Sequence, residues 1–306
     1  MLNYQGLIEQ LIKIFLYVCI GFIAAKGGVI KGEGRNFLSR LIVSVCIPAL
    51  LLSPAVSSEI VLTNAEIGLT LFVAFLWQLA MLGIGMLAAK LFCRERKERD
   101  VFAVMMGFGN VGIFGFPVIY PLYGELGLQF AALANCSFNL VLYSVGQQMT
   151  TGEKTAWGKL LRLLINPASI AAVSVPFLFL LRLPCPKVLT ETVSSIGNMT
   201  LPLLMFTVGS NLAEYSFSEL IRQPKVFAAI GVRLLLIPLI LLLPLRLLVP
   251  GEAMHNTLIL LSGMPSAGIA ASFCIIYQNH AREASTIVFV STIFSLLSIP
   301  LVALLL

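Results

Sequence analysis

Apolar stretches of about 20 residues follow one another along the whole chain, separated by short polar connections. A stretch of this length can cross the hydrocarbon core of a bilayer as a helix. Because lipid offers the backbone no hydrogen bonds, each stretch is expected to pair its own backbone groups in a helix. Charged residues make up 11% of the sequence, against roughly 25% in soluble domains. The sequence therefore predicts an all-α polytopic membrane protein, with residues 1–306 forming a single membrane domain.

Ten stretches can be assigned as membrane spans, and this even number places both ends of the chain on one side. The spans lie near residues 7–25, 37–55, 67–90, 101–122, 127–149, 164–182, 189–211, 225–248, 254–277 and 283–305. Of the 20 basic residues, most lie in the loops of one side, namely Lys26, Lys31, Arg35, Arg40, Lys90, Arg94, Arg96, Lys97, Arg99, Lys154, Lys159, Arg162, Arg222, Lys225 and Arg282. The positive-inside rule puts these loops in the cytoplasm. We expect a multi-pass protein of the cell (inner) membrane with both termini extracytoplasmic.

The two halves of the chain match at a constant offset of 154 residues. The matching pairs are Pro48 with Pro202, Gly109 with Gly263, Tyr123 with Tyr277, and Ser137 with Ser291. Each half holds five spans, and an odd number forces the two halves into opposite orientations. This pattern predicts a 5+5 inverted repeat, with repeat one in residues 1–153 and repeat two in residues 154–306.

The fourth and ninth predicted spans are interrupted by glycine and proline. The first interrupted segment is residues 102–120, with Asn110 immediately before a break at Gly112, Gly115 and Pro117. The second is residues 257–273, with its break at Ser262, Gly263, Pro265, Ser266 and Gly268. Interrupted apolar segments at corresponding places in two halves point to the substrate site of a transporter. A kinked packing helix is the alternative for either segment alone, because glycine and proline are frequent in membrane helices. Two interruptions at matched positions favour the site.

The predicted spans carry no carboxylate near their middle, since all 14 Asp and Glu residues lie in loops or at span ends. Proton relays and intramembrane enzymes usually need ionisable groups inside the bilayer, so both are disfavoured, as is a sodium site built from carboxylates. If the interrupted spans cross, two half-helix N-termini present partial positive charge to one spot, which favours an anion. The candidate substrate-binding residues are Asn110, Gly112, Pro117, Asn139, Arg233, Gly263, Pro265 and Ser266.

Two of these candidates keep alternative interpretations. Arg233 lies inside the eighth span, where a charge needs compensation. It either anchors a substrate carboxylate or snorkels or pairs with carbonyl groups near the inner surface. Asn135 and Asn139 are four residues apart and share a helix face. They either line a polar pathway or bond to neighbouring helices.

Other classes of function lack their signatures in this sequence. The net charge of +6 is spread over short loops, whereas nucleic-acid binding favours a basic stripe. The six cysteines are scattered without a metal-ligand spacing, so neither a metal nor another cofactor is expected. Residues 107–112 fit G-x-G-x-x-G, but they lie in an apolar span without the strand and acidic residue of a dinucleotide site.

Several motifs resemble the auxin efflux carrier family, which includes bacterial malonate and malate permease-like carriers and the plant PIN-FORMED exporters. The matching elements are Ile47-Pro48-Ala49-Leu50-Leu51, the N-x-x-x-x-G-x-P pattern from Asn110 to Pro117, Met264-Pro265-Ser266-Ala267, Ala284-Ser285-Thr286, Ser291-Thr292 and Ile299-Pro300. The resemblance covers essentially the whole chain. One departure concerns plant members, which carry a second proline about five residues after the position of Pro265, where this chain has Ile269-Ala270-Ala271.

The resemblance implies a fold shared with bile-acid symporter-like proteins. Spans 1, 2, 6 and 7 would form a scaffold, with homodimer contacts through spans 2 and 7. Spans 3–5 and 8–10 would form a mobile transport domain, and the substrate would bind where spans 4 and 9 cross and move by an elevator-like shift. Asn110 and Pro117 match the asparagine and proline at the crossing in span 4.

We therefore expect a secondary transporter for small organic anions, such as mono- or dicarboxylates or auxin-like acids, in a lipid bilayer. A membrane-embedded ligand sensor or a channel that uses the same mid-membrane pocket is the alternative. The lack of buried carboxylates favours uniport or transport driven by the membrane potential, while sodium held by backbone carbonyl groups remains an alternative.

Overall fold

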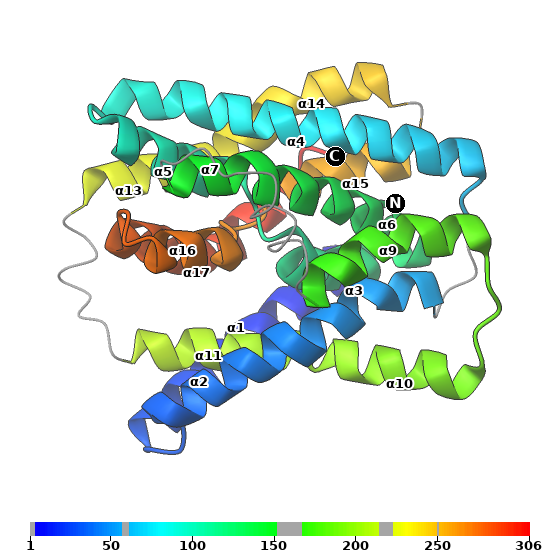
Figure 1. Ribbon diagram of the computed structural model, residues 1–306, viewed down its shortest axis with the longest axis horizontal. Coiled ribbons are helices and arrows are strands. Elements are labelled where there is room, and N and C mark those ends of the chain that lie inside the picture. Colours follow the sequence, from blue (N-terminus) through cyan, green and yellow to red (C-terminus); the bar gives the residue numbers. More distant parts are fainter. Residues whose placement is uncertain (1–3, 57–60, 152–166, 214–222, 250) are drawn as a thin grey trace.

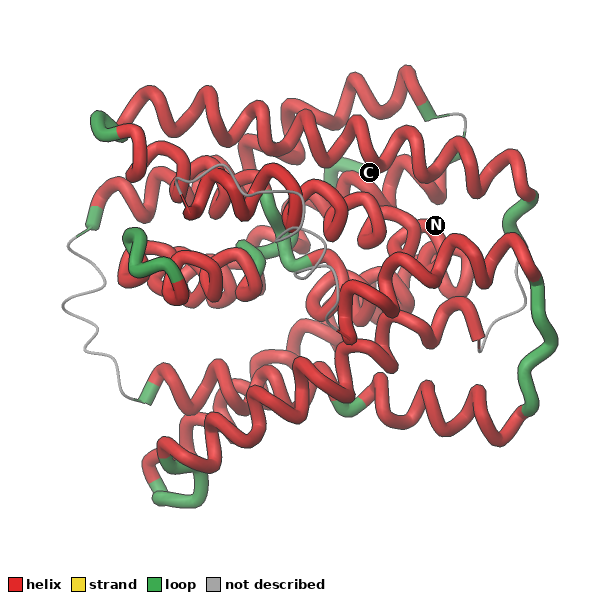
Figure 2. Tube along the Cα trace, in the orientation of Figure 1, coloured by secondary structure: helices red, strands yellow, loops and turns green. Residues whose placement is uncertain are grey.

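The computed structural model describes residues 4–56, 61–151, 167–213, 223–249 and 251–306, and these ranges are almost entirely helical (Figures 1 and 2). Within them, the single contact of β type is an isolated antiparallel bridge between Gly109 and Ser266. The predicted boundary between the repeats, at residues 153 and 154, lies outside the described residues, as do Lys154, Lys159, Arg162 and Arg222.

Helices form over most of the length of the described residues. In the first part of the chain they are α1 (Tyr4–Lys26), α2 (Gly32–Leu41), η1 (Ile42–Cys46), α3 (Ile47–Val56), α4 (Asn64–Phe92), α5 (Arg96–Gly107), η2 (Val111–Gly115), α6 (Phe116–Val141), η3 (Leu142–Gly146) and α7 (Gln147–Thr151). In the second part they are α9 (Pro167–Leu181), α10 (Lys187–Asn198), α11 (Thr200–Leu212), α13 (Pro224–Gly231), η4 (Val232–Leu236), α14 (Ile237–Leu248), α15 (Glu252–Ser262), α16 (Gly268–Ile276) and α17 (Ala281–Ala303). The η elements are single π-helical turns that continue the flanking α-helices.

Among the described residues, five helical runs are long and apolar enough to cross a membrane, which fits the predicted class of protein. They are Gly32–Val56, Asn64–Phe92, Val111–Thr151, Pro224–Leu248 and Ala281–Ala303. The run Val111–Thr151 has 41 residues. At about 1.5 Å per residue it is roughly twice as long as a bilayer core is thick. It bends at Gly124, where φ is 58° and ψ is −150°. The bend lies between the fourth and fifth predicted spans.

The helices gather in two groups in space. Figure 1 shows α4 to α7 and α13 to α17 in the upper part of the molecule, and α1, α2, α3, α10 and α11 in the lower part. In the upper group α4 packs on α5 and α6, α15 packs on α6, and α16 packs on α17. In the lower group α1 packs along α11, and α3 packs on α10. Helix α9 contacts both α3 and α6, so it joins the two groups.

Helices α1 and α11 touch backbone to backbone. A Cβ atom placed on Gly209 would lie 2.0 Å from the carbonyl oxygen of Val18, and one on Gly21 would lie 2.3 Å from that of Phe206. Small residues allow such an approach, which is a common way for helices to associate in a membrane. A larger side chain at either glycine would push the two helices apart.

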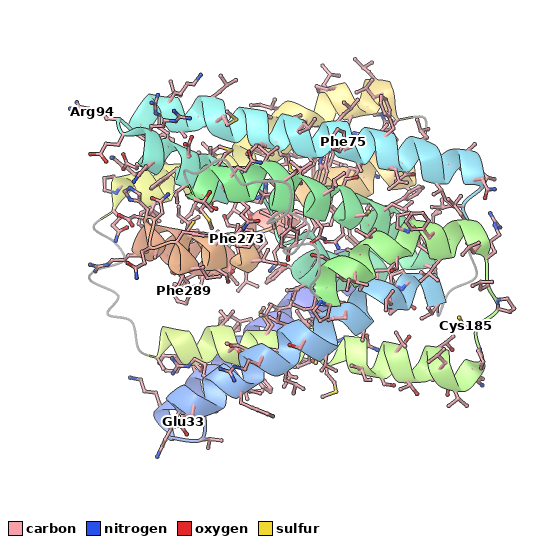
Figure 3. The ribbon with its side chains drawn as sticks, in the orientation of Figure 1. Glu33, Phe75, Arg94, Cys185, Phe273 and Phe289 are labelled. Atoms are coloured by element: carbon pink, nitrogen blue, oxygen red, sulfur yellow. The ribbon has the colours of Figure 1, made fainter. Side chains whose placement is uncertain are left out.

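The polar ends of the helices collect at two opposite ends of the molecule. Arg94 and Glu33 lie at one end and Cys185 lies at the other (Figure 3). At the first end Lys225 forms an ion pair with Glu98. At the second end the Arg182 guanidinium donates a hydrogen bond to the carbonyl oxygen of Leu62. Charged groups at both ends with apolar helices between them match the two surfaces of a bilayer.

Candidate functional site

The helix is interrupted in both of the segments that the glycine and proline pattern marked. Helix α15 ends at Ser262 and α16 begins at Gly268, so Gly263 and Pro265 lie in an unwound segment. In the first segment, however, the position of the interruption was predicted wrongly. The unwound residues are 108–110, and Gly112, Gly115 and Pro117 lie in the helical run that follows. Pro117 lies directly after the π-helical turn η2, inside the continuous run Val111–Thr151, so this proline does not end the helix.

The two unwound segments cross and are joined by their backbones. The N–H of Asn110 donates to the carbonyl oxygen of Pro265 at 2.7 Å, and the N–H of Ala267 donates to the carbonyl oxygen of Phe108 at 2.9 Å. Gly109 and Ser266 lie opposite each other in this antiparallel bridge. Backbone groups freed by a broken helix must find partners inside a membrane protein. Here each broken segment provides partners for the other.

The carbonyl groups at the end of α5 are bound by side chains from other helices. Ser266 Oγ donates to the oxygen of Met105 at 2.7 Å, and Gln78 Nε2 donates to the oxygen of Gly107 at 3.0 Å. The N–H of Ser266 in turn donates to Ser291 Oγ at 3.1 Å. Ser266 is fully buried and therefore helps to hold the crossing. The polar Gln78, in the middle of α4, was the signal that the sequence analysis missed.

Arg233 completes this side of the crossing. Its side chain is 0% exposed. Nε donates to the carbonyl oxygen of Met264 at 2.8 Å, Nη1 to that of Met106 at 3.0 Å, and Nη2 to that of Leu261 at 3.4 Å. Of the two interpretations of this residue, the pairing with carbonyl groups is observed, at the crossing instead of near a membrane surface. Its role as a substrate contact stays a prediction.

The opposite side of the crossing holds unused hydrogen-bond donors. Asn110 precedes η2 and is half-buried, and its side chain forms no hydrogen bond with any residue that the structure describes. The first N–H groups of a helix have no acceptor within that helix. At the start of η2 these include Gly112 and Ile113, and at the start of α16 they include Gly268 and Ile269. Gly268 is exposed, and both isoleucines are half-buried.

Asn135, not Asn139, approaches this donor cluster. A Cβ atom on Gly112 would lie 3.2 Å from Asn135 Oδ1, so the Asn135 amide faces the first turn of η2. Asn139 Nδ2 instead donates to the carbonyl oxygen of Asn135 at 2.7 Å, one turn back in α6. Both asparagines are buried. The shared face was predicted from their spacing, but the spacing could not tell which amide would reach the crossing.

The helix ends give the two sides of the crossing opposite electrostatic character. The C-terminal ends of α5 and α15 carry partial negative charge and meet the Arg233 guanidinium. The N-terminal ends of η2 and α16 carry partial positive charge and lie beside the free amide of Asn110. An anion bound there would accept hydrogen bonds from backbone N–H groups without a lysine or arginine in contact.

A cavity of about 450 Å³ lies elsewhere, between α1, α11 and α17. Its lining is almost wholly apolar and includes Ile14, Phe22, Val208 and Ile293. Such a lining offers almost no hydrogen-bond donors to an anion. The crossing is therefore the better candidate for a polar ligand.

Comparison with known proteins shows the family to which the chain belongs. The model of a family described as membrane transport protein matches residues 7–159 and 154–303, which together cover nearly the whole chain. The chain belongs to this family. It is the auxin efflux carrier family, whose motifs the sequence resembles.

Members of this family in archaea and bacteria align with the chain from end to end. An uncharacterized transporter of Methanothermobacter thermautotrophicus is 24% identical, over 97% of this chain and 98% of its own length. An uncharacterized transporter of Methanocaldococcus jannaschii is 24% identical over 96% of each chain. YfdV of Escherichia coli, also called an uncharacterized transporter, is 22% identical over 96% of each chain. Membership of the auxin efflux carrier family makes this chain a multi-pass membrane transport protein.

Proposed function

We propose that this transporter is a secondary carrier of small organic anions, with mono- and dicarboxylates as the substrate class. The observation that supports this proposal is the donor cluster at the crossing, where two helix N-termini and the free amide of Asn110 meet. A carboxylate needs two acceptor oxygens satisfied, and backbone N–H groups together with an amide supply such donors.

Within this proposal each candidate residue has its own role. Asn110 and the N–H of Gly112 contact the carboxylate directly. Pro117 helps to fix the helical run that begins with η2, so that the N-terminus of η2 points at the ligand. Gly263 and Pro265 keep the second segment unwound. Ser266 and Arg233 stabilise the crossing on the side opposite to Asn110. The positive charge of Arg233 acts on the bound anion across the crossing, without direct contact. Asn139 positions Asn135 by the hydrogen bond between them.

The transport step that we propose is an elevator-like movement of a 5+5 inverted repeat with ten spans. Two features support it. The upper group of helices contains both interrupted segments, and the lower group contains the close α1 and α11 contact (Figure 1). The upper group would carry the substrate past the lower group, which would act as the scaffold and form a homodimer through the second and seventh spans, α2 to α3 and α10 to α11.

Uptake into proteoliposomes tests the function. We expect saturable uptake of labelled malonate, malate or indole-acetate, measured with and without a sodium gradient. Saturable uptake of one of these acids would establish a carrier and its substrate class. Single-channel currents would instead favour a channel. If folded protein takes up none of the three acids but binds one of them, the sensor hypothesis replaces the carrier.

The proposed orientation can be tested with the cysteines of the chain. Cys185 lies in the connection between α9 and α10, at the end opposite to Arg94 (Figure 3). We expect a membrane-impermeant maleimide to label Cys185 in intact cells. Burial, aided by the nearby carboxylate of Glu98, raises the pKa of the Cys93 thiol to about 11, so this thiol stays protonated at neutral pH and competes little for the reagent.

The matched control places a cysteine at the opposite end of the molecule. Lys97→Cys in a Cys185→Ser background should be labelled only after the membrane is permeabilised, because Lys97 is an exposed residue in the first turn of α5, next to the basic connection from α4. Labelling of Lys97→Cys, but not of Cys185, in intact cells would reverse the proposed orientation.

A further inference from the structure

Three backbone carbonyl groups converge on one buried cation at the crossing. They belong to Met106 at the end of α5, and to Leu261 and Met264 at the end of α15. In carriers built with broken helices, unwound carbonyl groups and half-helix C-termini are the groups that coordinate a coupling ion such as sodium. The same kind of oxygen cluster is present here, but the guanidinium of Arg233 occupies it.

The charges at this cluster balance. A helix C-terminus carries roughly half a negative charge, so two such ends together carry about one. The single positive charge of Arg233 matches this sum. Among the residues that the structure describes, no carboxylate lies within ion-pair distance of the guanidinium. The helix ends are therefore its counter-charge.

Residues from two other parts of the chain pack closely against the Arg233 guanidinium. A Cβ atom on Gly109 would lie 1.9 Å from Nη2, so only a glycine leaves room there. On another side Nη1 contacts the sulfur of Met81 at 3.6 Å. The side chain is thus enclosed by α4 and the crossing.

We propose that Arg233 is a tethered cation that takes the place of a coupling ion at the crossing. The inference rests on the proposed carrier function for its transport consequence, which is that substrate binding and uptake need no sodium. Its structural consequence is independent of any substrate. The two half-helix C-termini stay together only while a cation lies between them, and removal of the side chain leaves an oxygen-lined seat that a free guanidinium ion fits.

Chemical rescue tests this inference without any substrate. We expect Arg233→Ala to lower the unfolding temperature of the purified protein, and guanidinium chloride, kept far below denaturing concentrations, to raise it again. Wild-type protein and Arg246→Ala should show no such rise, because Arg246 is a surface arginine of the same span, with a side chain that is 56% exposed. An equal response of all three proteins, or no response of Arg233→Ala, would overturn the proposal.

A second pair of variants covers the case in which Arg233→Ala does not fold. Arg233→Lys keeps a cation in the seat, whereas Arg233→Gln keeps hydrogen-bond donors without the charge. We expect the lysine variant to retain a higher unfolding temperature and roughly tenfold more uptake than the glutamine variant, since an unpaired group in this position is costly. Equal stability of the two variants would show that the charge has no role.

Uptake then separates the two proposals. If wild type takes up none of the acids but guanidinium rescues Arg233→Ala, the carrier function fails and the tethered cation stands. If wild type takes up an acid only with sodium present, the tethered cation as a replacement for the coupling ion is wrong, while the carrier function stands.

Discussion

The two sides of the crossing differ in how their backbone groups are satisfied. On the side of Arg233, the carbonyl groups at the ends of α5 and α15 are bound by Arg233, Ser266 and Gln78. On the side of Asn110, the first N–H groups of η2 and α16 have no helical acceptor, and the amide is free. Protein groups bind the carbonyl groups of the first side, and the second side is the one that we propose to bind the ligand. Substitutions on the first side should therefore lower stability, and those on the second should lower binding.

The largest effect is expected at Gly109, on the closed side. Gly109→Ala places a Cβ atom 1.9 Å from Arg233 Nη2, so the guanidinium must leave its carbonyl partners. We expect a loss of about 3 kcal/mol or more in the free energy of unfolding, because a buried charge loses its hydrogen bonds. Denaturation of purified protein measures this loss, and uptake should fall with it.

Gly83→Ala is the matched control for this variant. Gly83 lies in α4, and a Cβ atom there meets nothing within 4 Å. Alanine favours a helix over glycine, so we expect no loss of stability. If Gly109→Ala is as stable as Gly83→Ala, the closed side does not depend on the contact between Gly109 and Arg233.

A purely functional effect is expected at Asn110, on the open side. Asn110→Ala removes an amide that forms no hydrogen bond within the described structure, so the unfolding temperature should stay nearly unchanged. Uptake or binding of the carboxylate should fall about tenfold, as the loss of a hydrogen bond to a charged group predicts. Ser272→Ala, which alters an exposed hydroxyl group of α16, is the control. Undiminished uptake by Asn110→Ala would remove this amide from the proposed site.

The smallest effect is expected at Ser266, which again tests the closed side. Ser266→Ala leaves the buried carbonyl oxygen of Met105 without its 2.7 Å hydrogen bond from Oγ. We expect a loss of about 1–2 kcal/mol in the free energy of unfolding, with uptake reduced less than in Asn110→Ala. Ser174→Ala, at an exposed position in α9, should cost less. A reversed order of the two serine variants would mean that the closed side is not held by this hydrogen bond.

The sequence predicted the class of fold and the two interrupted segments, because both depend on local composition. Long apolar runs can cross a bilayer only as helices or barrels, and clustered glycine and proline weaken a helix wherever they occur. The exact residues of the first interruption were not predictable in the same way. Pro117 lies after a π-helical turn inside a continuous helical run, so the unwound segment precedes Gly112 instead of following it.

The partners of Arg233 could not be predicted from the sequence, because they are contacts between distant parts of the chain. Met106 lies 127 residues away from Arg233, and Leu261 lies 28 residues away. The cost of a buried charge predicted that compensating groups exist, but not that they would be the ends of two broken helices. Carbonyl groups belong to every residue, so no side-chain pattern marks the ones that are used.

The backbone bridge between residues 108–110 and 265–267 has a consequence for how this chain can vary. Its two hydrogen bonds join N–H and C=O groups, so at residues 110 and 267 they do not depend on which side chain is present, whereas residue 109 must stay a glycine beside Arg233. Side chains around the ligand can then be exchanged by mutation, and new substrates acquired, while the crossing itself persists. Proline is the exception, since at residue 110 or 267 it would remove a donor. In a random library over residues 110 and 267, many residues at these two positions should accordingly yield folded protein, and proline should not.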